Sequence, residues 1–182
     1  LGVVQNRGGH ALFYALGASR LDRTICVSTA YAGWQGTLGT VTGNDSEQMA
    51  DAELIVLWGI NASHTHINAM TLVKQARRRG AFVICVDPYR TPTARQADWH
   101  LMPRPGTDGA LALGVMHVLI GDGRVDQEYI QRATLGFAAL AQHVKQYDPE
   151  RVAAITGLAA GDVVAFAHRY GATRAAFIRV GI

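Results

Sequence analysis

The residues best suited to chemistry stand in short turns that each follow an apolar run. Asn61 and Thr65 come soon after the apolar run at residues 54–58, and Asp87 directly follows the run at residues 82–86. Exposed N–H groups at a turn that opens a helix favour an anion such as a phosphate. A carboxylate, which only accepts hydrogen bonds, suits the hydroxyl groups of a ribose. These residue types therefore indicate a nucleotide site.

A third turn, Gly106-Thr107-Asp108, follows a short apolar run at residues 99–102. The carboxylate of Asp108 would match the adjacent N1–H and N2–H₂ donors of guanine in a bidentate pair. Taken singly, Asp87 and Asp108 are more commonly plain turn and helix-capping residues. Three polar turns on one edge of a sheet favour the nucleotide interpretation.

Cys26 is the candidate metal ligand. The sequence has two cysteines, too few for a disulfide framework, and Cys85 lies inside an apolar run where it is predicted to be a small core residue. Cys26 stands among small residues, where a thiolate could reach a soft metal without obstruction. A lone cysteine is more commonly a packed loop residue, so both interpretations stay open. The seven histidines show no zinc-type spacing, and no separate zinc or iron–sulfur site is expected.

A strand, a turn and a helix at residues 53–80 position the first polar turn. The run at residues 54–58 is apolar without alternation, which is typical of a strand covered on both faces of a parallel sheet. Ser63 or Thr65 could cap the helix that follows. The three arginines at residues 77–79 are predicted to form its solvated end.

The order of strand, turn and helix then repeats along the chain. Further strands are predicted at residues 82–86, 99–102 and 174–180, and the chain from Val125 is mainly helical until the last of these. Between Ile25 and Asp45, glycines and small residues predict a loop that could hold one short helix in its middle, and residues 45–52 could form a further helix that leads into the first strand. We therefore expect an α/β fold, a doubly wound, mainly parallel, Rossmann-like sheet flanked by helices, with a helix-rich second half, forming one domain over residues 1–182.

Composition limits the possible functions. The chain has 182 residues, of which 49% are hydrophobic and 17% charged, as in an ordinary globular domain. A net charge of +3 is too small and too scattered to indicate nucleic-acid binding. No uninterrupted apolar stretch approaches the ~20 residues that span a bilayer, so no membrane insertion is expected. The sequence starts at Leu1 without a signal peptide and stops after an apolar run, so we expect a fragment and predict no compartment.

The common nucleotide motifs are missing. No G-x-G-x-x-G follows the strand at residues 54–58, and no Walker A sequence occurs in the chain. An ordinary nicotinamide dehydrogenase is therefore disfavoured, whereas an unrelated Rossmann-like nucleotide-binding domain stays open as an alternative.

Several segments resemble the large subunit of the molybdopterin oxidoreductases, the family that includes dimethyl sulfoxide reductase, periplasmic nitrate reductase and formate dehydrogenase. The resemblance covers nearly the whole chain and is carried by LGASRLDRTIC, the WG-x-N turn, DP-x-x-T-x-TA-x-x-AD and PGTD-x-AL. Family members hold molybdenum or tungsten between two molybdopterin guanine dinucleotides. The resemblance implies that one dinucleotide is contacted by Trp58, Gly59, Asn61, His64, Thr65, Asp87, Pro88, Arg90, Thr91, Gly106, Thr107 and Asp108.

The resemblance also implies a catalytic role for Cys26. Its position matches the protein ligand to the metal, with Ser28 as the alternative. The family's amino-terminal iron–sulfur motif and carboxyl-terminal domain are missing, which predicts an inner portion of a larger catalytic subunit, inactive alone. A 4Fe-4S cluster is possible in the parent protein but not in this segment.

The implied reaction is two-electron or oxygen-atom transfer to a small-molecule substrate, with a possible electron-transfer subunit as partner. An alternative is a scaffold of the same fold that holds the cofactor without catalysis.

Overall fold

The structure, a computed structural model, describes residues 8–19, 24 and 26–181. They form two compact units, one ending at Thr42 and the other beginning at Gly43. The first unit contains two helices, α1 (Gly8–Ala15) and α2 (Cys26–Leu38). The prediction of one domain over residues 1–182 stays a prediction.

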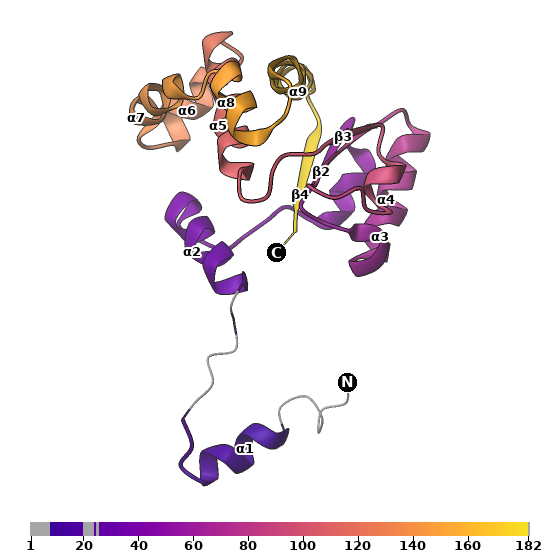
Figure 1. Cartoon of the computed structure of the whole chain (residues 1–182), viewed down its shortest axis with the longest axis vertical. Coiled ribbons are helices and arrows are strands. Elements are labelled where there is room, and N and C mark those ends of the chain that lie inside the picture. The colour runs from indigo at the N-terminus through magenta and orange to yellow at the C-terminus, as the bar shows by residue number, and fades with distance from the viewer. Residues whose placement is uncertain (1–7, 20–23, 25, 182) are drawn as a thin grey trace. The chain divides into compact units, whose positions relative to one another are not determined.

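The second unit alternates helices and strands (Figure 1). In chain order, with η for 3₁₀ helices, its elements are η1 (Ser46–Asp51), β1 (Leu54–Trp58), α3 (Ala62–Thr65), α4 (Ile67–Arg78), β2 (Phe82–Val86), η2 (Ala94–Gln96), β3 (Trp99–Leu101), α5 (Asp108–Gly121), α6 (Gln127–Ala133), α7 (Phe137–His143), η3 (Val144–Gln146), α8 (Pro149–Thr156), α9 (Ala160–Ala172) and β4 (Ala176–Val180).

The four strands form one parallel sheet in the order β3-β2-β1-β4. Leu54 at the start of β1 is in register with Phe82 of β2 on one side and with Ala176 of β4 on the other. The chain runs from β1 outward to β2 and β3, and then returns to the opposite side of β1. The predicted doubly wound α/β fold is thus confirmed, with its switch point between β1 and β4.

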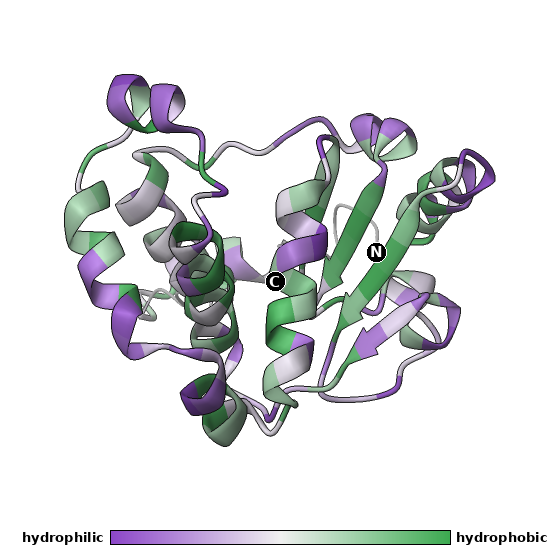
Figure 2. Ribbon diagram, turned by 90° about the horizontal axis from the view of Figure 1, so that it is seen from above, coloured by the Kyte–Doolittle hydropathy of each residue, from purple (hydrophilic) through white to green (hydrophobic). Residues whose placement is uncertain are grey.

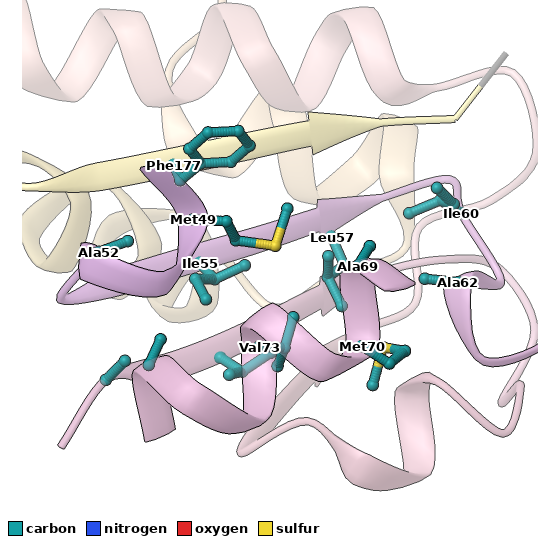
Figure 3. Close-up of a cluster of buried hydrophobic side chains, with 13 residues drawn as sticks. Met49, Ala52, Ile55, Leu57, Ile60, Ala62, Ala69, Met70, Val73 and Phe177 are labelled. Carbon is teal, nitrogen blue, oxygen red and sulfur yellow. The ribbon is translucent and has the colours of Figure 1, made fainter. Parts of the chain in front are cut away.

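Helices cover both faces of this sheet, which explains why its central strands are apolar without alternation. On one face, Met49 of η1 and Val73 of α4 pack against Ile55 and Phe177 (Figure 3). On the other face, Phe166 of α9 belongs to a second buried cluster formed with α5 and α8. The hydrophobic colouring of the central strands in Figure 2 follows from this burial on both sides.

Two helices on the second face pack closely at a glycine. A Cβ on Gly114 of α5 would lie 2.7 Å from Cγ2 of Val152 on α8. Because valine is rigid about its first side-chain torsion, this contact has little room to adjust. Gly114 therefore sets the spacing of the two helices.

One prediction about local structure is wrong. The segment predicted as a loop carries α2, which has 13 residues, because its alanines favour helix and no proline interrupts it. The predicted solvated helix end at residues 77–79 is confirmed, since all three arginines are exposed; Arg77 also pairs with Asp98 and Arg79 with Asp51 at the surface.

The start of α8 follows from its sequence, since Asp148 accepts hydrogen bonds from two backbone N–H groups and Pro149 follows it at the first helical position. Among the described residues, no single helix has both the length and the apolar character to cross a membrane; α8 and α9 meet that test only as a pair, bent by 114°.

Candidate functional site

A cavity of about 350 Å³ opens at the switch point, where the carboxyl ends of β1 and β4 meet. Ligands of open α/β sheets bind in this place. The cavity is lined by Gly59, Ile60, Asn61, Thr65, His66, Arg179, Val180 and Gly181. Three of the predicted contact residues, Gly59, Asn61 and Thr65, therefore share one cavity.

Two glycines bring the strand ends together beside this cavity. The Gly181 N–H donates to the Trp58 carbonyl at 2.8 Å, and a Cβ on Gly181 would overlap the carbonyl oxygen of Gly59. Gly59 itself has a φ of 63°, which favours glycine. The cavity wall at these two positions therefore carries no side chain.

Thr93 joins the first polar turn to the second. Its hydroxyl donates to Oδ1 of Asn61 at 2.9 Å and accepts the N–H of Ser63 at 2.9 Å. The Ser63 hydroxyl oxygen lies 3.1 Å from the hydroxyl oxygen of Thr93. Because Thr93 is fully buried, these bonds are shielded from water and fix the two turns against each other.

Within the second turn, Asp87 and Thr91 are buried and hold the backbone. Asp87 Oδ1 accepts the N–H of Tyr89 at 2.9 Å, and Thr91 Oγ1 accepts the N–H of Ala94 at 3.0 Å. Pro88 and Arg90 are exposed. The turn role of Asp87 is thus observed, and its predicted contact with ribose stays a prediction.

The third turn is joined to the first by a single hydrogen bond. The indole N–H of Trp58 donates to Oδ1 of Asp108 at 2.7 Å. Asp108 is exposed, at the first residue of α5. Thr107 stands at the N-cap position without a capping bond, since its hydroxyl donates to the Arg104 carbonyl. Gly106 has a φ of 78°, in the left-handed region.

The predicted capping role of Ser63 and Thr65 is wrong. The chain forms two helices there, and the residues at their N-cap positions are Asn61 and His66, neither of which makes a side-chain capping bond. Thr65 instead donates to the Asn61 carbonyl at 3.1 Å. His64 is exposed on α3.

Sequence reasoning missed two residues of the site, Thr93 and Arg179, whereas His66, which flanks the first turn, was a candidate for capping or phosphate contact. Thr93 lies in the quoted DP-x-x-T-x-TA run, but only the fold shows which atoms it meets. Arg179 could have been noticed as a charged residue near the end of an apolar strand, where one face must be buried.

The candidate metal ligand lies in the first unit. Cys26 is the first residue of α2, and its side chain is outside the part of the molecule that the structure describes. The alternative, Ser28, is exposed, and its hydroxyl lies 3.5 Å from the Thr24 carbonyl. The metal-ligand role of Cys26 stays a prediction. Cys85 is confirmed as a core residue, and burial raises the pKa of its thiol to about 12.

Comparison with known proteins supplies the family. The family model described as molybdopterin oxidoreductase matches residues 12–181. The chain belongs to the molybdopterin oxidoreductase family. The resemblance noted in the sequence is therefore confirmed.

Individual relatives agree with this family. The chain is 41% identical over 169 residues to the probable oxidoreductase YoaE of Bacillus subtilis, matching 93% of this chain and 25% of that protein. It is 36% identical over 140 residues to the alpha subunit of the F420-dependent formate dehydrogenase 1 of Methanococcus maripaludis, matching 77% of this chain and 21% of that subunit.

A solved structure supports the fold. Acetylene hydratase from Pelobacter acetylenicus superposes with a TM-score of 0.78 at 30% identity, covering 86% of this chain and 21% of that one. The chain thus spans a quarter or less of the length of each of these three proteins.

Proposed function

We propose that this chain is an inner portion of a molybdenum or tungsten oxidoreductase and binds one molybdopterin guanine dinucleotide at the carboxyl edge of its sheet. The observation that supports this most directly is the polar cavity at the β1/β4 switch point. Two hydrogen-bonded links, through Thr93 and through Trp58, hold the three predicted contact turns around that edge.

The residues present fit such a cofactor. Gly59 and Gly181 line the cavity without side chains, so a ligand can approach the backbone closely there. The exposed carboxylate of Asp108 is accessible to the paired donors of guanine. Asn61 and Thr65 offer polar groups beside the same cavity.

Each turn then has a separate task. Asp108, oriented by Trp58, binds the base; Asp87 binds the ribose; and the turn from Gly59 to Thr65 binds phosphate. Cys26, or Ser28 in its place, is the protein ligand to the metal. When bound, the cofactor supplies two-electron or oxygen-atom transfer, while this chain positions it.

The full-length parent protein is assigned a substrate class and a partner subunit by the same reasoning. Relatives named as formate dehydrogenase alpha subunits suggest a small-molecule substrate and an electron-transfer partner subunit for the parent as well. A 4Fe-4S cluster in the parent would be held outside this segment.

The assignment is tested through Asp108→Asn in the full-length protein that carries this chain. The substitution keeps the shape but turns one acceptor oxygen into a donor, which opposes the donors of guanine. We expect the purified variant to retain at least about tenfold less guanine nucleotide, because a charged hydrogen bond contributes about 1.5–3 kcal/mol. The measurement is the guanine nucleotide released on acid hydrolysis, alongside metal content by mass spectrometry.

Asp162→Asn is the matched control. Asp162 is also an acidic residue in the first turn of a helix, α9, so it reports the cost of losing a charge at a helix start. Equal nucleotide content in both variants and the wild type would contradict the proposed role of Asp108.

A further inference from the structure

Two buried polar atoms in the second unit have no hydrogen-bond partner among the described residues. They are Nδ1 of His66 and Nε of Arg179. Buried polar side-chain atoms are nearly always hydrogen-bonded, and leaving one unpaired is unfavourable. A group outside the described residues is therefore expected to satisfy this pair.

The two atoms belong to residues that line the same cavity. His66 stands before the first turn of α4, and Arg179 lies near the carboxyl end of β4, so the switch-point cavity has both in its wall. A second cavity of about 350 Å³, on the side of η1 and α4, is also lined by both. His66 and Arg179 thus stand where two cavities meet.

The surroundings of Arg179 set it apart from other arginines of the chain. Arg77 and Arg79 pair with carboxylates, whereas no ion pair of the described residues includes Arg179. The residues that line the switch-point cavity include no acidic side chain. Glu47 lines only the second cavity. The charge of Arg179 is therefore available to an anion that enters from the switch point.

We propose that Arg179 and His66 form an anion-binding pair that holds a phosphoryl oxygen of the guanine nucleotide. This inference rests on the proposed function and adds two residues to it. A guanidinium is the side chain best suited to phosphate, and an imidazole N–H can donate to a second oxygen. Asn61 and Thr65, in the same cavity wall, add neutral polar groups. Asp108 then selects the base, and Arg179 and His66 anchor the phosphate.

Three probes separate these two contributions in the full-length protein stripped of its cofactor: guanosine, GDP and inorganic pyrophosphate. Calorimetry should show that the wild type binds GDP more tightly than guanosine. Arg179→Met removes the charge and keeps the length of the side chain. It should lower the affinity for GDP and for pyrophosphate by about tenfold or more and leave the affinity for guanosine unchanged.

Further variants keep the test independent of folding. Arg179→Lys retains the charge without the fork of donors and should lose part of the GDP affinity. His66→Phe keeps an aromatic ring but removes the ring nitrogens, and it should lower the affinity for GDP by a smaller factor than Arg179→Met does. The control is Arg78→Met, which removes an exposed charge from the last turn of α4 and should change none of the three affinities.

Each outcome decides the matter. If Arg179→Met weakens the binding of guanosine and GDP equally, or changes neither, the pair is not a phosphate anchor. If the wild type binds pyrophosphate through Arg179 but binds guanosine and GDP no better than pyrophosphate, the anion pair stands and the guanine assignment fails. If no probe binds, both fail.

Discussion

Replacing Thr93 with valine should loosen the candidate site without changing its shape. Valine has nearly the same volume as threonine but a methyl group in place of the hydroxyl, and Thr93 is fully buried, out of reach of the surrounding solvent. The change leaves the Ser63 N–H without its acceptor and Asn61 Oδ1 without its donor.

The expected magnitude follows from these two losses. An unsatisfied buried group costs about 1–3 kcal/mol, and a lost hydrogen bond about 0.5–1.5 kcal/mol. We therefore expect Thr93→Val to lower the free energy of unfolding by about 2–4 kcal/mol. Urea unfolding followed by circular dichroism gives this value, and the guanine nucleotide content of the same preparations shows whether the site is affected.

Two other variants separate the hydroxyl from the methyl group. Thr93→Ser keeps the hydroxyl, so its cost should be about 1 kcal/mol for the lost methyl, with the nucleotide retained. Thr134→Val removes an exposed hydroxyl that donates to the Ile130 carbonyl at 2.8 Å, and should change stability by less than about 0.5 kcal/mol. The reasoning is refuted if Thr93→Val is no more costly than Thr134→Val.

Three further predictions concern other parts of the chain. Trp58→Phe should lower guanine nucleotide retention, because Asp108 loses the indole donor at 2.7 Å. Gly114→Ala should destabilise by about 1–2 kcal/mol in urea unfolding, since overpacking against a rigid valine outweighs the gain in helix propensity. Cys26→Ala in the full-length protein should abolish turnover and remove one sulfur ligand in X-ray absorption, whereas Ser28→Ala should change neither.

Matched controls exist for the first two of these. Trp99→Phe removes an indole that also packs on Phe166 but makes no contact with Asp108 in the described hydrogen bonds, so retention should be unchanged. Gly161→Ala, in α9 with open space at its Cβ, should be neutral or stabilising. If Gly114→Ala behaves like Gly161→Ala, the close packing of α5 on α8 is not the constraint described above.

The sheet could be predicted from sequence because its signal is local. An apolar run of strand length that ends at a polar turn can be recognised in the amino-acid sequence, and β1 and β2 have the predicted bounds. The length of α2 could not be predicted because glycine content outweighed the alanines, although a glycine lowers helix propensity by only about 1 kcal/mol.

The site was predictable in part for the same reason. The turns stand at the ends of strands, so their place on one edge follows from a parallel sheet. The links between them do not, since Thr93 and Asn61 are 32 residues apart and Trp58 and Asp108 are 50 apart. The unpaired atoms of His66 and Arg179 required the fold, because a sequence does not say which polar atoms lack partners.

The hydrogen bond between Trp58 and Asp108 affects the entropy of ligand binding. The indole is packed on the ring of Phe166, with centroids 6.0 Å apart, so the core behind the strand fixes the ring whose N–H holds the carboxylate. Asp108 is therefore exposed to solvent and yet limited in rotamer freedom. A ligand that donates hydrogen bonds to this carboxylate removes little conformational entropy from its side chain, and that preorganisation favours tight binding by a single surface residue.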